Sequence, residues 1–432
     1  MDLSINAIDL VPGKGADKKK GTTLAGRYDQ LKTNRDPFLQ RGRDCAKVTI
    51  PSACPDSNMG DHGKLQTPWQ SSGSRGVNHL QNKLGVTLFP PNTPFFKLEI
   101  DSLALRIEEQ GPEIKTELDT ALVKVEQAVM NELETMSARA SLSQAFKQLL
   151  ITGNVLLYVT PEAIRVIRLQ DYCVVRSPMG EVTEILVEEE AYPEALPDGF
   201  LPDQEEEDEK LGPIKKTVKI HTCVKIENGV TRWYQECKGK EIENTYGMCP
   251  ENCSPWIVLR YERLDSEEYG RSHVEQYYGD LTALESLYQA SIEAAAAASK
   301  VLFLVNPNGT TRPKTLSSAA NGAIVQGNAA DVTVIQAQKQ ADLQITMSMI
   351  ERIEQRLEFA FLLNQAVQRP GERVTAEEIR YMAQTLEQTI GAFYSILTQE
   401  LQLPLVRRLI YMLQKKGKLP EFPNSQETGD PL

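Results

Sequence analysis

Two long helical patterns in the last third of the chain, separated by a short β-rich stretch, constrain the fold more than any other feature. The first begins at Ser272 and Glu275, a capping box in which each side chain satisfies a backbone N–H at the helix start. It ends in the alanine run 294–298, which has high helix propensity and lets neighbouring helices approach closely. The second runs from Asp342 to Leu363, which corresponds to a rod of roughly 33 Å. Its apolar residues favour one face, at Leu343, Met347, Ile350, Leu357 and Phe361, beside Met349 and Ile353.

Short β signals occupy the segment between these two rods. Val301 to Val305 predicts a strand, and Asn306 to Gly309 predicts a turn. Residues 322–335 predict a hairpin that turns near Gly327 and Asn328. We therefore expect a small β unit carried between two helices.

The region before residue 153 combines loops with helices. Residues 1–25 are rich in Gly, Lys and Asp, which is typical of a mobile arm. A helix is expected from Arg27 to Ala46, broken at Pro37, and another from Gln70 to Leu84. Two further long helices are expected within Leu103 to Leu150.

The periodicity changes at Gly153, where short β-branched or apolar runs begin, separated by Gly and Pro. They are Val155–Val159, Ala163–Leu169, Tyr172–Arg176, Val182–Val187, Val218–Cys223, Thr231–Glu236 and Trp256–Tyr261. Together these runs predict a small antiparallel β unit. The expected fold class is therefore α+β and mainly helical.

An acidic segment, 188–209, interrupts this β unit and contains three prolines. Such a segment cannot bury enough apolar area to order itself, so we expect a solvated insertion. An acidic docking loop is the alternative reading of the same residues.

A loop over 364–374, which carries two arginines, a proline and a glycine, follows the second rod. Thr375 and Glu378 then form another capping box, which predicts a helix to about Gln402. Pro404 is expected to break or kink this helix before the apolar helical pattern resumes.

The net charge of −12 bears on the kind of partner. A protein that grips DNA through its phosphates usually carries a basic surface, so tight nucleic-acid binding is disfavoured. The same charge suits a surface that DNA must slide past without sticking.

Compartment signals are few. The seven cysteines are odd in number and scattered, which fits a reducing compartment better than a disulfide framework. We expect no signal peptide and no membrane association, because the sequence has neither a leader pattern nor a bilayer-length apolar run.

The sequence contains no convincing pattern for catalysis or metal binding. The glycine–lysine-rich stretch 13–22 lacks the Gly-Lys-Ser/Thr ending of a phosphate-binding loop, which argues against a motor ATPase. A zinc site usually needs two pairs of ligands that are close in sequence. Here only one pair, of two cysteines, is close, its spacing is loose, and the other candidate ligands lie upstream. The residues concerned are His221, Cys223, Cys237, Cys249 and Cys253. The residues alone indicate an α+β interaction protein that is not an enzyme and uses no cofactor or metal.

Several segments closely resemble the head-to-tail connector, or portal, family of podoviruses. The most specific block is GERVTAEEIRY at 371–381. The others are QTPWQ at 66–70, GSRGVN at 73–78, YGRS at 269–272, YGDL at 278–281, LE at 284–285, QKQAD at 338–342, AVQR at 366–369, YSIL at 394–397 and QELQLPLV at 399–406. The resemblance extends over most of residues 26–415 in unchanged order, and leaves out the first 25 residues, the acidic insertion and the tail after Pro420.

Members of this family form twelve-fold rings with wing, stem, clip and crown regions around a central channel. The resemblance implies the following division of this chain: an arm at 1–25, a wing at 26–273, a first stem helix at 274–299, a clip at 300–341, a second stem helix at 342–363, a tunnel loop at 364–374, a wing helix at 375–400 and a short crown at 401–432.

The implied function is a ring-shaped channel at one capsid vertex, through which double-stranded DNA is packaged and ejected. The implied partners are further copies of the chain in a dodecamer, the terminase large subunit and then the tail adaptor, major capsid and scaffolding proteins, and internal core or ejection proteins. The implied location is the portal vertex of the virion, after assembly in the host cytoplasm. The rival is a tail adaptor or other virion scaffold without a DNA tunnel. An enzyme of packaging would need a phosphate loop or an acidic metal cluster.

The resemblance also singles out residues for DNA contact. An acidic channel wall that repels phosphates, steadied by sparse basic rings, reconciles the net charge with the passage of DNA. The candidate contacts in the tunnel loop are Gln368, Arg369, Glu372 and Arg373. The alternative is that the two arginines hold the loop by salt bridges to Glu372 or Glu377, and Arg380 is expected to be structural.

The clip is the expected docking region for the packaging motor and later the tail adaptor. Arg312 and Lys314 are the candidate contacts there.

Overall fold

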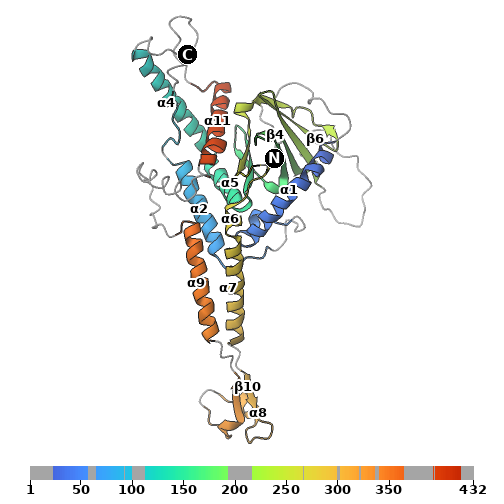
Figure 1. Ribbon diagram of the computed structural model, residues 1–432, viewed down its shortest axis with the longest axis vertical. Coiled ribbons are helices and arrows are strands. Elements are labelled where there is room, and N and C mark those ends of the chain that lie inside the picture. The colour runs from blue at the N-terminus through green and yellow to red at the C-terminus, as the bar shows by residue number, and fades with distance from the viewer. Residues whose placement is uncertain are drawn as a thin grey trace.

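The computed structural model describes residues 23–56, 65–91, 93–99, 112–192, 217–265, 267–298, 302–320, 323–335, 340–363, 393 and 395–419. Two antiparallel helices, α7 (Tyr278–Ala298) and α9 (Gln340–Ala360), run side by side from a broad body to a small distal unit (Figure 1). We call these two helices the stalk. The body contains helices and two antiparallel sheets, so the described residues have the predicted α+β fold.

The first body helix, α1 (Leu24–Lys47), lies diagonally across the larger sheet (Figure 1). It continues through Pro37, so the predicted break is wrong. Packing on both sides of the proline explains this, because Leu31 is buried against the sheet and Leu39 in the main core. The hydroxyl of Thr23 caps the helix by accepting from the Gly26 N–H at 3.3 Å, so the expected arm at 1–25 extends too far.

Three further helices form the other side of the body: α2 (Ser72–Leu88), α4 (Pro112–Thr135) and α5 (Ala138–Thr152). α2 continues past Gly85, where the sequence predicted its end, because Leu84 and Leu88 are both fully buried one turn apart. α4 and α5 confirm two long helices before Gly153, within the described residues. Short 3₁₀ helices are η1 (Pro51–Ala53), η3 (Leu169–Asp171) and η5 (Glu251–Cys253).

The predicted β runs are confirmed as strands, but they form two sheets and not one unit. The smaller sheet has the order β2–β1–β9, with β1 (Asn154–Val159), β2 (Ile164–Arg168) and β9 (Trp256–Arg260). The larger has the order β3–β4–β5–β6–β7, and β8 also pairs with β6. Its strands are β3 (Tyr172–Arg176), β4 (Val182–Ala191), β5 (Val218–Glu227), β6 (Val230–Cys237), β7 (Lys240–Glu241) and β8 (Gly247–Pro250).

The start of the acidic insertion is corrected by the larger sheet. Glu188 to Ala191 belong to β4 and pair with Val218 to His221 of β5. Glu188 is satisfied there, because its carboxylate lies 2.9 Å from Lys219 Nζ and 3.1 Å from His221 Nε2. Acidic residues with basic cross-strand partners can therefore continue the strand. The rest of the expected insertion, 193–209, lies outside the described residues.

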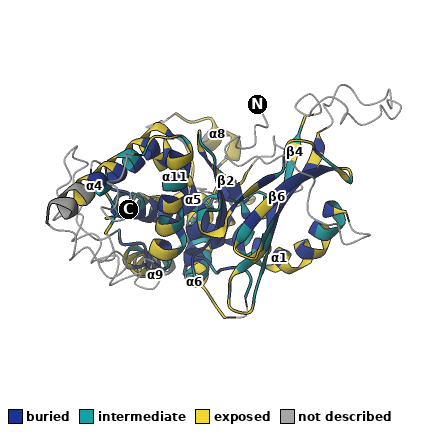
Figure 2. Ribbon diagram, turned by 90° about the horizontal axis from the view of Figure 1, so that it is seen from above, coloured by how far each residue is buried: buried dark blue, intermediate teal, exposed yellow. Residues whose placement is uncertain are grey.

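α5 lies near the middle of the body and organises the main core (Figure 2). Its buried residues Phe146, Leu149 and Leu150 join a cluster that includes α2, the smaller sheet and the base of the stalk. Fully burying one such side chain contributes about 1.5–3 kcal/mol. The stalk is therefore continuous with the core of the body.

The C-terminal helix also packs into the body. A π-helical turn, η7 (Thr398–Gln402), immediately precedes α11 (Leu403–Lys415), which agrees with the expected break or kink near Pro404. Leu405 and Leu409 are fully buried in the main core. The predicted helix start at Thr375 and residues up to 392 lie outside the described part of the chain.

Candidate functional site

The stalk begins at a short helix, α6 (His273–Gln276), which is separated from α7 at Tyr277. The predicted Ser272 cap is confirmed, since its hydroxyl accepts from the Glu275 N–H at 3.0 Å. The Glu275 carboxylate does not close the box in the described structure. It accepts from Arg271 at 3.3 Å and from Arg41 at 3.5 Å. The expected single helix is therefore two helices, and its acidic residue connects the stalk base to α1.

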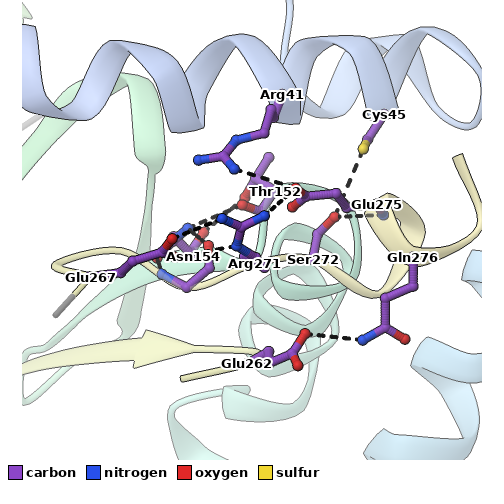
Figure 3. A network of polar contacts seen from close by, with 11 residues as sticks. Arg41, Cys45, Thr152, Asn154, Glu262, Glu267, Arg271, Ser272, Glu275 and Gln276 are labelled. Carbon is purple, nitrogen blue, oxygen red and sulfur yellow. Dashed lines mark hydrogen bonds and ion pairs between the residues drawn. The ribbon is translucent and has the colours of Figure 1, made fainter. Parts of the chain in front are cut away.

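Arg271 is the centre of a polar network at the stalk base (Figure 3). Its guanidinium lies between the carboxylates of Glu267, at 2.8 Å, and Glu275, at 3.3 Å. The hydrogen bonds from Arg271 hold the pKa of Glu267 below its ordinary value. These groups are about one-third exposed or less, so the network contributes modestly to stability. Its main effect is to fix the direction in which the stalk leaves the body.

The backbone on the other side of Arg271 is clamped by Asn154 (Figure 3). The Asn154 amide donates to the Gly270 carbonyl at 2.8 Å, and its oxygen accepts from the Gly270 N–H at 2.7 Å. Gly153 has φ +74°, and a Cβ there would lie 2.6 Å from the Arg271 carbonyl carbon. Only glycine permits this close approach of α5, β1 and the stalk base.

His273, at the start of α6, connects the base of the stalk to the end of α9. Burial lowers the pKa of His273 to about 4, so the imidazole is neutral at pH 7. The Ala360 carbonyl can only accept, so Nε2 donates to it over 3.2 Å. The other nitrogen, Nδ1, therefore accepts from the Tyr261 hydroxyl at 2.7 Å. One neutral side chain thus bonds both the last turn of α9 and the end of β9.

Along the stalk, apolar residues of α7 face those of α9. The buried set comprises Leu281, Leu284, Ile350, Ile353 and Leu357. Met347 was predicted on the same face but is 64% exposed, and the side chain of Leu343 lies outside the described part. Polar contacts fix the level of the helices: Tyr288 donates to Glu354 at 2.8 Å, and Arg356 pairs with Asp280 at 2.9 Å.

The distal unit differs from the predicted hairpin over 322–335. β10 (Leu302–Val305) pairs with β11 (Val332–Ile335), and between them lie α8 (Pro313–Ser317) and η6 (Ala329–Asp331). The predicted turn at Asn306 to Gly309 is confirmed by a 3.0 Å backbone bond between them. Asp331 explains the pairing, because its carboxylate accepts from the backbone N–H groups of Thr310, at 2.8 Å, and Thr311, at 3.3 Å. Desolvation raises the pKa of Asp331, but these bonds outweigh it and hold the pKa below its ordinary value.

The sequence-predicted site residues fall in two places. Arg312 and Lys314 are exposed on the distal unit, just before and within α8. The tunnel-loop candidates Gln368, Arg369, Glu372 and Arg373, and their neighbours Glu377 and Arg380, lie outside the described residues.

The possible zinc ligands do not converge. Within the described residues, no group of three or more His, Cys, Asp or Glu side chains is arranged to hold a metal ion. Cys223 and Cys237 are buried in the strands β5 and β6, whereas Cys253 is only half-buried in η5.

Two positions that join the stalk to the body were not singled out from the sequence. Arg271 has a glutamate four residues before it and another four residues after it, a spacing that favours ion pairs. That signal could have found it. His273 has no local signal, because its partners at 261 and 360 are brought together only by the fold.

Residues 21–431 match the model of the family described as bacteriophage head to tail connecting protein. The portal protein of Escherichia phage T7 is 40% identical over 422 residues, which cover 94% of this chain and 78% of that protein. The portal protein of Enterobacteria phage T3 is 40% identical over 421 residues, which cover 95% and 77%. A solved chain from the neck of an empty GTA particle is 12% identical with a TM-score of 0.40, and covers 79% of this chain and 78% of that one.

No helix in the described ranges is both long and apolar enough to pass through a bilayer. The family match covers nearly the whole sequence. The chain belongs to the bacteriophage head to tail connecting protein family, and functions as a portal protein.

Proposed function

We propose that twelve copies of this chain form a ring at one vertex of a phage capsid, and that double-stranded DNA is packaged and ejected through its centre. The observation that carries the proposal is the stalk. Two helices continuous with the body core project as one rod and end in a separate folded unit (Figure 1). A ring of such rods encloses a channel, with the bodies at one end and the distal units at the other.

The tunnel loop is proposed to lie inside this channel. α9 ends at Ala360, and the loop 364–374 begins four residues later. His273 holds the last turn of α9 in place, so the loop starts from a fixed point. We assign DNA contact to Gln368, Arg369, Glu372 and Arg373. The chain has a net charge of −12, so only a few basic positions in the channel can attract the DNA phosphates.

The distal unit is the proposed clip. Arg312 and Lys314 are exposed there, at the end of the molecule that is furthest from the body (Figure 1). Cations at such a site can pair with acidic groups of the terminase large subunit and then of the tail adaptor. Major capsid and scaffolding proteins, and internal core or ejection proteins, would contact the bodies after assembly in the host cytoplasm.

The proposed channel is passive. The sequence has no phosphate-binding loop, so the work of packaging falls to a partner ATPase. The chain is accordingly proposed not to be an enzyme.

The twelve-fold ring and its central channel are tested by negative-stain images and mass measurement of the purified full chain. We expect rings with a central hole and a mass of twelve chains. A homogeneous monomer or small oligomer that never forms rings at high concentration would exclude the proposal.

A further inference from the structure

α9 carries a row of large side chains that the single chain leaves exposed. Ile345, Met349, Arg352, Arg356 and Phe359 follow spacings of four and three residues, so they lie on one face. Ile345 is 58%, Met349 51% and Phe359 73% exposed. Four of the five also line an open groove of about 810 Å³. We call this row the α9 outer stripe. Its apolar area favours a partner that removes it from water.

α7 carries a matching row of small residues, which we call the α7 outer stripe. Its members, at the same alternating spacing and all exposed, are Gly279, Ala283, Ser286, Ala290, Glu293 and Ala297. Small side chains leave room for large ones from a facing helix, as ridges fit grooves. The one charged member is the carboxylate of Glu293.

The two stripes face opposite directions. Ser286 follows the buried Leu284 by two residues, a rotation of ~200° about the helix axis. Phe359 follows the buried Leu357 by two residues in the same way. Each stripe therefore lies mainly outside the contact between α7 and α9, although the long side chain of Arg356 reaches back to Asp280. A surface that matches a different surface on the opposite edge produces head-to-tail association, which closes into a ring when the rotation permits.

Charge and position along the stalk also favour a contact between the α9 outer stripe of one copy and the α7 outer stripe of the next. Arg352 is exposed and has no ion-pair partner among the residues that the structure describes, whereas Arg356 is paired with Asp280. The level set by Tyr288 and Glu354 places Arg352 within about one turn of Glu293. Helical side chains lean toward their own N-terminus. Because the helices are antiparallel, Arg352 leans toward the distal unit and Glu293 leans toward the body, so they lean toward each other.

We infer that neighbouring copies of this chain pack the α9 outer stripe against the α7 outer stripe, with Arg352 of one copy paired with Glu293 of the next. The occupant of the stripe is thus a second copy of the chain. The inference rests on the proposed ring and names the contact that fixes the register of its stalks.

Disulfide cross-linking tests the contact. Met349→Cys and Ala290→Cys are introduced together, the protein is oxidised, and non-reducing gels are run beside images of the same sample. The two positions lie on opposite outer faces of one stalk, so a bond between them joins different copies. We expect a ladder of covalent oligomers that disappears on reduction.

Controls come from the same helices. Each single variant reports the background from native cysteines, of which six are buried and Cys253 is half-buried. Met349→Cys with Ile292→Cys places the second thiol on another face of α7 and should give no ladder. Rings without a ladder in the Met349–Ala290 variant would overturn this contact and leave the proposed function standing. Absence of rings in the unmodified chain would overturn the proposed function itself.

Charge reversal tests the ion pair. Arg352→Glu and Glu293→Arg should each raise the protein concentration needed for half-maximal ring assembly by about tenfold, and the double variant should recover most of it. Arg232→Glu, an exposed arginine on β6, is the matched control and should assemble like the parent. A double variant that assembles no better than the weaker single variant would contradict the pairing.

Discussion

The imidazole of His273 lies 3.2 Å from the carbonyl oxygen of Ala360, so the first turn of α6 is bonded to the last turn of α9. The two residues are separated by the whole stalk and distal unit along the chain. This bond brings the outgoing and returning helices together at the body, next to the proposed tunnel loop.

Protonation of His273 should destabilise the fold in mildly acidic solution. The folded-state pKa, about 4, is below the ordinary 6.5, so the unfolded chain binds the proton more tightly between these values. The contribution is fully present above pH 6.5 and is lost as pH falls toward 4, to a total of about 3 kcal/mol. Denaturant unfolding measured from pH 7.5 to 4.5 checks this, with His273→Gln as comparison. An equally steep pH dependence in the variant would contradict it.

Gly153→Ala should be far more damaging than Gly229→Ala, although both glycines have φ +74°. A Cβ at 153 would meet the Arg271 backbone at 2.6 Å, whereas nothing lies within 4 Å at 229. We expect a loss of at least about 3 kcal/mol for Gly153→Ala and about 1 kcal/mol for Gly229→Ala, because only the first adds a clash to the backbone strain. Equal losses in urea unfolding would show that the close approach carries no cost.

Reversing the charges of Arg312 and Lys314 should weaken binding of the packaging motor without affecting ring formation. Both side chains are exposed, so their replacement should change stability by less than about 0.5 kcal/mol. Binding of purified rings to the terminase large subunit is measured at two salt concentrations. Arg232→Glu on the body serves as the control. Unchanged affinity in the Arg312→Glu, Lys314→Glu double variant would exclude this docking role.

Arg369→Ala should leave ring assembly intact and reduce the retention of packaged DNA, because it removes one cation from each copy in the proposed channel. Genome content of purified particles and ring images check the two parts separately. Arg380→Ala is the comparison, since that arginine is expected to be structural. Particles that hold full-length genomes normally would rule out a role for Arg369 in DNA retention.

Elements with local determinants were predictable. Ser272 caps α6 through an N–H three residues away, and Gly153 ends α5 with a left-handed conformation that glycine adopts readily. Features that depend on distant contacts were not. Pro37 does not break α1 because both flanks pack on the body, and β11 pairs with β10 because Asp331 bonds Thr310, 21 residues earlier.

The candidate site likewise combines residues that the local sequence pattern could place with residues whose partners are distant in sequence. Arg312 and Lys314 lie on an exposed unit between the two rods, which helical periodicity marks on either side, whereas their role in docking remains a prediction. The role of His273 was not predictable, since Tyr261 and Ala360 reach it from different elements. The DNA contacts were implied by family resemblance and remain predictions.

The contact at His273 anchors the long stalk at one end only, so a small change of angle there produces a large displacement at the distal unit. Each stalk helix has 21 residues, which is about 32 Å of rod anchored at one buried end. A tilt of about 5° at that end moves the distal unit by ~3 Å, roughly the rise of two helical residues. The buried contact at His273 therefore determines how precisely the distal unit is positioned for a partner.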